Sequence, residues 1–256
     1  MGRLADRPAI VTGSAQGMGL AIATSLAAEG ARVAIADVNP ERIDSAVADL
    51  QSKGATAAGF VMDVTNRAQV RKVVAEVAAR WGGVEILVNN AGGSLNTPYH
   101  LEEIEEKHWN LVLDVNLKGA FFCCQAAIPL MAERRRGAVV NVSALAGHWR
   151  ASLAGVQYTA AKAGLEGLTR QLAYDFGPKG IRVNAVAPTV ILTGDRMKGL
   201  WDNKDEAEQQ RIINQIPLRR LSTAAEVGAA VVFLASDEAS YITGTTLDVS
   251  GGRYLR

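Results

Sequence analysis

Short apolar runs alternate with amphipathic stretches along the whole chain. The first run, Pro8–Thr12, leads into a glycine-rich turn and then a stretch with helical spacing that ends at Gly30. The predicted strands are residues 8–12, 32–37, 56–64, 85–90, 137–143, 180–188 and 245–250. The predicted helices are residues 20–30, 40–54, 67–82 and 102–134, a helix that contains Tyr158, and residues 224–236.

The alternation of strand and helix predicts the fold class. The strands are apolar on both faces, which is typical of a parallel sheet covered on both sides. We therefore expect an α/β fold with a doubly wound, Rossmann-like parallel sheet of about seven strands, as a single domain over residues 1–256. Residues 193–221 interrupt the alternation with a polar, helix-forming stretch, which predicts a substrate lid.

Composition and charge narrow the class of protein. The chain has 256 residues, 48% of them hydrophobic and 21% charged, with a formal net charge of +1. That balance is ordinary for a globular protein and provides no field that would steer nucleic acid or a membrane surface. The basic run at residues 134–136 falls between a helix and a strand, where basic side chains suit a helix C-terminus. We expect no nucleic-acid partner and no membrane partner.

The cysteines and the N-terminus indicate the compartment. Cys123 and Cys124 are adjacent in an apolar helix and have no spacing typical of a disulfide framework or a metal site, so they are interpreted as small buried hydrophobes. The first residues lack the apolar core of a signal peptide, and no run approaches 18 uninterrupted apolar residues. These features predict a soluble cytoplasmic protein without a metal.

The turn after the first strand, VTGSAQGMG, is a candidate phosphate site. Gly13, Gly17 and Gly19 would let the backbone approach a pyrophosphate at the N-terminus of the following helix. The spacing is G-x-x-x-G-x-G, not the usual G-x-G-x-x-G. A tight strand–helix turn needs glycine in any case. The main evidence for a phosphate site is therefore that the motif lies between the first predicted strand and the first predicted helix.

Asp37 ends the second strand, 18 residues after Gly19. A carboxylate there can accept hydrogen bonds from the adenosine ribose hydroxyls and would repel a 2′-phosphate. Neither Gln16 nor Val38, the neighbours best placed to approach that phosphate, is an arginine. The pattern favours NAD over NADP, with a turn or helix-capping aspartate as the alternative.

Two further motifs follow. NNAGG, from Asn89 to Gly93, ends the fourth strand, at the sheet edge where open α/β folds bind ligands; an ordinary Asn/Gly turn is the alternative. YTAAK places Tyr158 and Lys162 at i and i+4 on one helix face. A cation at that distance lowers the pKa of a phenol toward the range of a general acid or base, whereas the alternative is an ordinary exposed helix face.

Taken together, TGSAQGMG, NNAG, YTAAK and the late NAVAP resemble the motifs of the NAD-type short-chain dehydrogenase/reductase family, in order and spacing, over essentially the whole chain. The resemblance implies that Tyr158 exchanges the alcohol proton while Lys162 holds the nicotinamide ribose and lowers the phenol pKa. It implies that Asn116 supports a proton-relay water. The cofactor-binding residues that it implies are Gly13, Gln16, Gly17, Met18, Gly19, Asp37, Val38, Asp63, Val64, Asn89, Ala91, Gly92, Tyr158, Lys162, Pro188, Ile191 and Thr193.

The strand end NVSALAG departs from the family pattern N-x-x-S-x-x-G, whose serine binds the substrate oxygen. Aligned without a gap, the serine column falls on Ala144, and Ser143 lies one place early. A shift of one residue turns a side chain to the other face of a strand, so Ser143 serves as the catalytic hydroxyl only if the backbone bulges after it. Either Ser143 fills the role or no serine does.

PTVILT departs as well, because Thr189 stands where the family usually has glycine. A β-branched residue does not readily take a positive φ, so either this backbone is ordinary or the loop is rebuilt. Substrate contacts are expected from variable segments that hold Leu95, Asn96, residues 148–150 and Trp201; ordinary surface loops are the alternative.

The sequence predicts an enzyme that moves a hydride between NAD(H) and a small alcohol or ketone, such as a sugar, a polyol or another small hydroxy compound. The alternatives are an NADPH-dependent 3-oxoacyl-thioester reductase and a non-catalytic NAD(H)-binding regulatory protein. In the resembled family, the helices around Asn116 and Tyr158 form a four-helix contact between subunits. The resemblance therefore implies a homotetramer, with a homodimer second.

Overall fold

Seven parallel strands form one sheet in the order β3-β2-β1-β4-β5-β6-β7. The computed structural model describes residues 2–151 and 153–255. The strands are β1 (Pro8–Thr12), β2 (Arg32–Asp37), β3 (Ala57–Val61), β4 (Ile86–Asn89), β5 (Gly137–Val142), β6 (Ile181–Pro188) and β7 (Thr246–Val249). The order reverses between β1 and β4, and the carboxyl ends of the strands on either side of that point form the edge where α/β sheets bind ligands.

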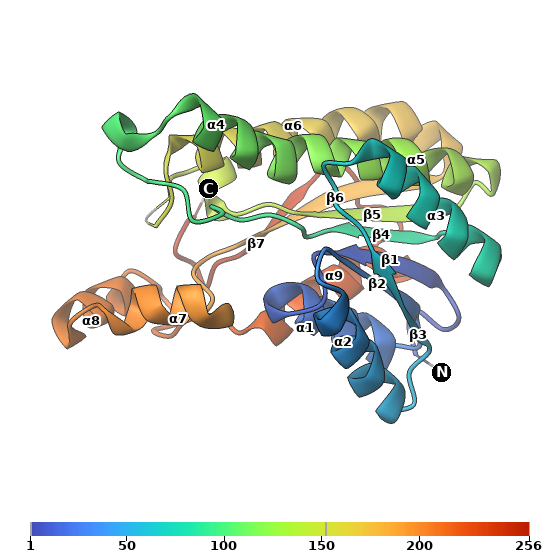
Figure 1. Ribbon diagram of the computed structural model, residues 1–256, viewed down its shortest axis with the longest axis horizontal. Helices are drawn as coiled ribbons and strands as arrows, with labels where there is room; N and C mark the ends of the chain where they lie inside the picture. Colours follow the sequence, from blue (N-terminus) through green and yellow to red (C-terminus); the bar gives the residue numbers. More distant parts are fainter. Residues whose placement is uncertain (1, 152, 256) are drawn as a thin grey trace.

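Two helical layers cover the sheet (Figure 1). The helices on one face are α1 (Gly17–Ala28), α2 (Pro40–Ser52) and α9 (Ala224–Ala235), and those on the other are α3 (Arg67–Trp81), α4 (Glu106–Leu113), α5 (Gly119–Glu133) and α6 (Val156–Phe176). The predicted doubly wound α/β fold is confirmed, with its strands within a few residues of their predicted positions.

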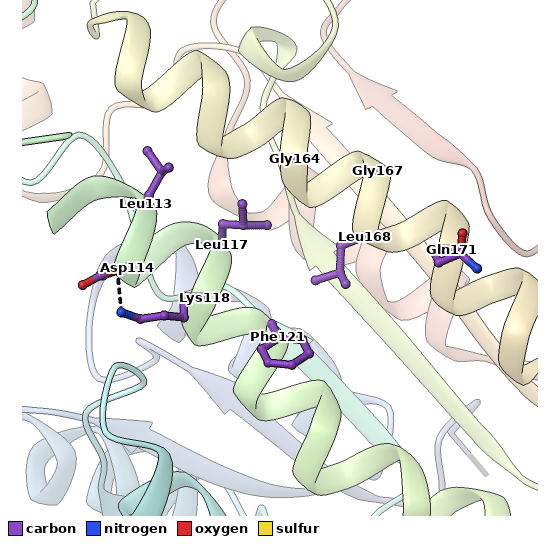
Figure 2. A pocket seen from close by; sticks show the side chains of 9 residues that line it. All are labelled: Leu113, Asp114, Leu117, Lys118, Phe121, Gly164, Gly167, Leu168 and Gln171. Atoms are coloured by element: carbon purple, nitrogen blue, oxygen red, sulfur yellow. Dashed lines mark ion pairs between the residues drawn. The ribbon is translucent and has the colours of Figure 1, made fainter. Parts of the chain in front are cut away.

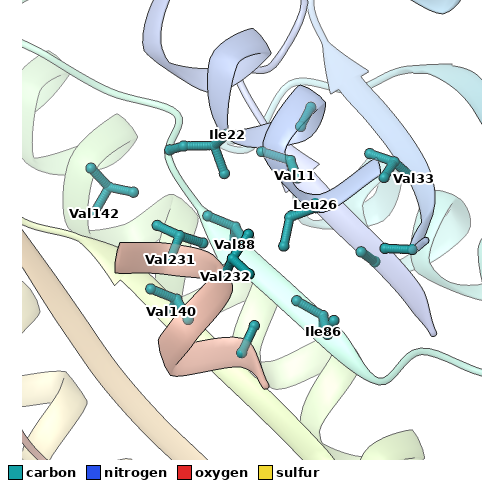
Figure 3. Close-up of a cluster of buried hydrophobic side chains, with 14 of the residues drawn as sticks. Val11, Ile22, Leu26, Val33, Ile86, Val88, Val140, Val142, Val231 and Val232 are labelled. Atoms are coloured by element: carbon teal, nitrogen blue, oxygen red, sulfur yellow. The ribbon is translucent and has the colours of Figure 1, made fainter. Parts of the chain in front are cut away.

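Successive strand residues supply the two layers of core. Val11 packs with the side chains of α1 and α9, whereas its neighbour Ile10 packs with those of α3 and α5. Figure 3 shows the first layer, where Ile22 and Leu26 of α1 and Val231 of α9 lie against the strands. Because both faces of the five central strands are buried, these strands lack an apolar–polar alternation, whereas the edge strands β3 and β7 are partly exposed.

Local capping fixes where several helices begin. Asn39 accepts a hydrogen bond from the Arg42 amide at the start of α2, and Pro40 occupies the first turn. Asn66 caps α3 in the same way. Thr223 and Glu226 form a reciprocal capping box at the start of α9.

The helix predicted for residues 102–134 is interrupted. A short 3-10 turn (Leu101–Glu103) precedes α4, and a π-helical turn (Asp114–Lys118) separates α4 from α5. By length and composition alone, Glu106–Glu133 could cross a membrane. Here it lies on the sheet and packs against α3 and α6, as a core helix does.

The segment after β6 leaves the two layers. It forms α7 (Gly194–Asp202) and α8 (Glu206–Asn214), which project beyond the carboxyl edge of the sheet (orange in Figure 1). No residue of α8 is buried, and Ile216 is the first buried position after it. Cys123 and Cys124 are both buried, and burial raises the pKa of both thiols, so they are inert in the core.

Candidate active site

The glycine-rich turn brings two strand ends into backbone contact. Gly13 and Gly17 have positive φ values of 61° and 58°. A Cβ on Gly13 would lie 2.8 Å from the Cα of Ala91, and one on Gly19 would lie 2.1 Å from the Gly13 carbonyl oxygen. Side chains at Gly13 and Gly19 would therefore displace backbone, which accounts for both glycines.

The N-terminus of α1 suits an anion. Its N-cap, Gln16, makes no side-chain capping bond, and the first turn contains no acidic residue. The amides there are open to a phosphate in the field of the helix dipole. Met18 lies one residue into the helix and is partly buried against the core, so its side chain anchors the turn.

Asp37 lies beside this turn at the end of β2. Its carboxylate accepts hydrogen bonds from the amide of Ala15 at 3.1 Å and from that of Val38 at 2.8 Å. These bonds hold the carboxylate at the sheet edge. Arg42, at the start of α2, donates a hydrogen bond to the Gln16 side chain, and so a cation that the sequence analysis overlooked reaches this corner.

Asp63 and Val64 follow β3. The Asp63 carboxylate accepts hydrogen bonds from the amide and the hydroxyl of Thr65, both at 2.8 Å. Val64 is buried against Gly119, where a Cβ would lie 2.7 Å from a Val64 methyl group. Because β3 pairs with β2, Asp63 and Val64 lie at the same edge of the sheet as Asp37.

The two asparagines of NNAGG have different positions. Asn89 is buried and donates to the Asn141 side chain at 2.8 Å, which links β4 to β5 inside the sheet. Asn90 instead donates to the carbonyl oxygens of Thr12 and Gly13, at 3.0 and 2.9 Å. The prediction named Asn89, but it is the Asn90 side chain that holds the glycine-rich turn in place.

Asn116 lies in the π-helical turn and is buried. Its side chain accepts from the Gly93 amide and donates to the carbonyl oxygens of Gly93 and Val112, all at 2.9 Å. A Cβ on Gly92, which has a φ of 147°, would lie 2.3 Å from the Asn116 amide oxygen. Gly92 therefore has to be a glycine for Asn116 to pack against the strand end. Turns of π-helix are often found at functional sites.

Tyr158 and Lys162 lie on the first turns of α6, as the i, i+4 spacing predicts. The Lys162 ammonium is 5.6 Å from the centre of the Tyr158 ring. Lys162 is buried and donates a hydrogen bond to the Val142 carbonyl at 2.8 Å. Burial lowers the pKa of Lys162 to about 8. A lysine with this pKa is charged at neutral pH and loses its charge in mildly alkaline solution.

Ser143 is enclosed behind the strand end. Its side chain is 2% exposed, and its hydroxyl donates to Glu166 of α6 at 2.9 Å. Its amide is shared between the carbonyls of Val186 and Asn141, and Ala144 follows in an extended conformation, partly exposed. Successive extended residues face opposite ways, so the two side chains do not share a surface.

The Glu166 carboxylate continues into a cluster that the sequence analysis did not predict. The same oxygen that accepts from Ser143 lies 2.9 Å from His148 Nδ1, and His148 Nε2 lies 3.0 Å from Asp248 of β7. The i, i+4 spacing of Lys162 and Glu166 was readable on α6, but nothing local to the sequence links it to His148 or to β7. The cluster joins the β5–α6 loop to the last strand.

The segment after β6 returns toward the glycine-rich turn. Pro188 ends β6, and Ile191 is buried. Thr193 begins α7 directly opposite Gly17, where a Cβ would lie 3.7 Å from the Thr193 Cβ. Thr189 is not among the non-glycine residues with a positive φ, so its backbone is ordinary.

The strand ends therefore enclose one continuous site. The glycine cradle and open helix N-terminus suit a pyrophosphate, Asp37 suits a ribose, and Tyr158 with Lys162 provides a proton donor beside a cation. These features fit a nicotinamide dinucleotide. Within residues 2–151 and 153–255, no grouping of three or more His, Cys, Asp or Glu side chains could hold a metal ion.

Comparison with known proteins agrees with this geometry. A family model described as enoyl-(acyl carrier protein) reductase matches residues 13–253. The chain is 37% identical over 250 residues to the (2S)-((R)-hydroxy(phenyl)methyl)succinyl-CoA dehydrogenase subunit BbsD of Thauera aromatica, covering 98% of this chain and 97% of the relative. It is 36% identical over 250 residues to the 3-oxoacyl-(acyl-carrier-protein) reductase FabG of Thermotoga maritima, covering 98% of each.

A solved structure from Sinorhizobium meliloti 1021, described as a short-chain alcohol dehydrogenase, superposes with a TM-score of 0.90 at 38% identity, covering 98% of this chain and 97% of that one. The chain belongs to the short-chain dehydrogenase/reductase family. It is an oxidoreductase that uses a nicotinamide cofactor, as the motifs predicted.

Proposed function

We propose that the protein transfers a hydride between NAD(H) and a secondary alcohol or ketone of small size. The observation that carries this proposal is the Tyr158–Lys162 pair beside the dinucleotide cradle, on α6 at the carboxyl edge of the sheet. The nicotinamide supplies the hydride chemistry. The chain's own residues bind the dinucleotide and move the proton.

Tyr158 is the proposed general acid and base. Its phenol donates a proton to the carbonyl oxygen on reduction and accepts one from the alcohol on oxidation. Lys162 stabilises the phenolate with its positive charge, which is worth most in a site from which water is excluded. Asn116 holds Gly93 through two hydrogen bonds, and we assign it the support of a proton-relay water near Lys162.

The substrate-binding serine is the least regular part of this mechanism. The Ser143 hydroxyl is buried and donates its hydrogen bond to Glu166. This supports the alignment in which Ala144 occupies the position of the family's serine. In that register Tyr158 alone donates to the substrate oxygen. Loss of one such donor costs about 2.7–4 kcal/mol in comparable sites, so the chemistry is slower and not abolished.

NAD is the proposed cofactor. The Asp37 carboxylate is held at the end of β2 by backbone amides and would repel a 2′-phosphate. Arg42 argues for NADP, because its guanidinium donates to Gln16 beside Asp37 and could pair with a 2′-phosphate. We give more weight to Asp37, since its carboxylate is fixed by the backbone whereas Arg42 is exposed.

A second candidate is a 3-oxoacyl-thioester reductase that uses NADPH. The FabG and BbsD relatives, whose names specify acyl-carrier-protein and CoA substrates, favour it at 36–37% identity. A purely regulatory NAD(H)-binding protein is the third reading, motivated by Ala144 and Thr189. The joint presence of Asn116, Tyr158 and Lys162 in one site weighs against it.

One experiment separates these readings. Purified protein is incubated with NAD⁺ or NADP⁺ and a panel of secondary alcohols, and with NADH or NADPH and ketones or 3-oxoacyl thioesters, while absorbance at the reduced-nicotinamide band is followed. We expect turnover with NAD(H) and a fall of about 10²–10⁴-fold for Tyr158→Phe, with cofactor binding retained. Undiminished turnover in Tyr158→Phe would refute the mechanism.

The proposed assembly is a homotetramer, with a homodimer second. A groove on the outer face of the molecule runs between the α4–α5 region and α6 (Figure 2). Leu113, Leu117 and Phe121 line one side, and Gly164, Gly167 and Leu168 line the other. Gly164 accommodates Leu117 of the same chain, whereas Gly167 leaves room for a neighbouring helix. The occupant that we propose is the same pair of helices from a second copy of the chain.

The proposed location is the cytoplasm. Both cysteines are buried thiols without a disulfide, as is usual for proteins of reducing compartments. The formal net charge of +1 supports neither a nucleic-acid nor a membrane partner.

A further inference from the structure

A cluster of aromatic and basic side chains lies at the carboxyl edge of β6 and β7. The β5–α6 loop supplies Trp149 and Arg150, and the C-terminal segment after β7 supplies Arg253 and Tyr254. Figure 1 shows the C-terminal end of the chain beside this loop. The dinucleotide cradle lies around β1 and β2, so this end of the edge is left for the substrate.

Two guanidinium groups share the Trp149 ring. The guanidinium carbon of Arg150 lies 5.0 Å from the centre of the ring, and that of Arg253 lies 5.9 Å from it. The centre of the Tyr254 ring also lies 5.9 Å from the Trp149 ring. Trp149 is 37% exposed, so the ring forms part of a surface that a ligand can reach. Arginine stacked on an aromatic face keeps its edge donors available for hydrogen bonds in the plane of the guanidinium.

Arg253 is held by groups that surround the substrate side. It donates to the Thr189 hydroxyl at 3.2 Å and to the Gln215 side chain at 3.1 Å. Thr189 directly follows β6 in the segment assigned to the nicotinamide, and Gln215 ends α8 of the predicted lid. Arg253 therefore contacts both the end of β6 and the residue that follows α8.

Arg150 and Arg253 place two positive charges beside the Trp149 ring. Burial and, after it, the charge of Arg150 lower the pKa of Arg253. His148 Nε2 lies 3.0 Å from Asp248, and Glu166 contacts both His148 and Ser143. Among the described residues, Arg150 has no carboxylate partner, whereas Arg220 is paired with Glu226.

We propose that Arg150 and Arg253 form a binding site for an anionic group of the substrate, a carboxylate or a phosphate, that lies away from the reacting carbon. The exposed Arg150 presents a fork of N–H donors that matches the oxygens of either group, and the negative charge relieves the repulsion between Arg150 and Arg253. This proposal rests on the proposed oxidoreductase function and specifies its substrate class as anionic alcohols and ketones.

Matched substrates provide the kinetic test. The carboxylate arm compares 3-oxobutanoate with its methyl ester, and the phosphate arms compare dihydroxyacetone phosphate with dihydroxyacetone and acetoacetyl-CoA with the acetoacetyl N-acetylcysteamine thioester. We expect the anionic member of at least one pair to have the higher kcat/KM, and the pair that responds distinguishes carboxylate from phosphate. Arg150→Gln and Arg253→Gln should each raise KM for that anion by roughly tenfold to a hundredfold, with KM for its neutral partner nearly unchanged.

Arg80→Gln is the matched control, because it removes the same charge from the exposed last turn of α3, away from the carboxyl edge. Arg150→Lys tests the fork, since it keeps the charge and loses bidentate geometry. NADH binding by each variant shows whether the site still folds. Equal kcat/KM for anionic and neutral members in every pair would overturn the proposal, as would an equal loss on both members in the arginine variants.

A binding readout separates this proposal from the proposed function. Titration of the cofactor-free protein with 3-oxobutanoate or inorganic phosphate should change tryptophan fluorescence saturably. The change should be absent from Trp149→Phe and weakened in Arg150→Gln, more so at low ionic strength. A fluorescence response without turnover of any alcohol or ketone tested would uphold the anion site and refute the proposed reaction with small alcohols and ketones. Turnover without a response to either anion would do the reverse.

Discussion

The Lys162 side chain is buried and donates a hydrogen bond to the Val142 carbonyl. Its pKa is lowered to about 8 by burial, so folding disfavours the charged form that the proposed mechanism uses. The lysine that the proposed mechanism uses is thus one whose buried charge destabilises the cofactor-free fold at neutral pH, a conflict between function and stability.

Lys162→Met should therefore stabilise the cofactor-free protein. Between the folded pKa of about 8 and the unfolded value, the unfolded state binds more protons, so wild-type stability rises with pH over that window. Below it the full penalty of about 3 kcal/mol applies, partly offset by the hydrogen bond to Val142. Thermal unfolding from pH 6 to 10 should show a higher Tm for Lys162→Met at pH 7 and a shrinking difference above pH 8.

The exposed Lys72 of α3 provides the control for that measurement. Lys72→Met should change Tm little and with no such pH dependence. A Lys162→Met variant that is less stable than wild type across the whole range would contradict the assignment of Lys162 as a desolvated charge.

Ser143 and Ala144 allow a second residue-scale prediction. Because the Ser143 hydroxyl donates to buried Glu166, Ser143→Ala should cost about 1 kcal/mol of stability and leave kcat/KM of the folded enzyme within a few-fold of wild type. Ala144→Ser should raise kcat/KM by supplying the absent donor. A 10²-fold loss in folded Ser143→Ala would instead restore Ser143 to the catalytic role.

A local sequence motif predicts a contact between two side chains reliably only when both residues lie on the same helix or strand. Tyr158 and Lys162 are on one helix, so their proximity follows from the helical period. The positions of Asn89 and Ser143 depended on which way a strand end faces, and Arg42 contacts Gln16 from 26 residues further along the chain. Tertiary contacts decide such cases, and a single sequence does not contain them in readable form.

At the scale of elements, the interrupted helix is the clearest departure from expectation. Its apolar pattern runs through from α4 to α5, which predicts one helix, but the π-helical turn places Asn116 against Gly93. Propensity scales do not distinguish a π turn from an α turn, because both use the same residues. The driving contact is between Asn116 and a strand end more than 20 positions earlier.

The α7–α8 segment is the second feature at this scale. Thr193 faces Gly17 across the site, and α8 buries no residue, so the segment is held mainly at its ends. We predict that its amides exchange quickly without cofactor and are slowed by NADH, as in a lid that closes over the site. Hydrogen exchange by mass spectrometry over residues 194–214 provides the measurement, with α9 as the slow internal reference. Slow exchange that NADH does not alter would refute the lid.

For the molecule as a whole, alternation of strand and helix was sufficient to predict the fold. The central strands are apolar on both faces and every crossover contains at least one helix, which leaves the doubly wound sheet as the simple solution. The sequence does not encode the strand order so directly. Pairing of β1 with β4 joins segments more than 70 residues apart.

The tetramer prediction belongs to this scale. Phe121 is 42% exposed in the groove between α5 and α6, so Phe121→Glu would place a charge in the proposed subunit contact. Light scattering at micromolar concentration should show a tetramer for wild type and a smaller species for Phe121→Glu. Ala79→Glu, on the exposed side of α3, should leave the mass unchanged. A wild-type monomer would refute the assembly.

The central position of β1 in the sheet has a consequence for synthesis on the ribosome. β1 emerges first, yet one of its two neighbours, β4, is complete only at Asn89. At roughly 5–20 residues per second, the chain waits several seconds with that flank of β1 unpaired. The nucleotide half of the sheet can then close while α6 is still untranslated. A nascent chain would thus acquire its dinucleotide cradle before it possesses the tyrosine that makes the cradle useful.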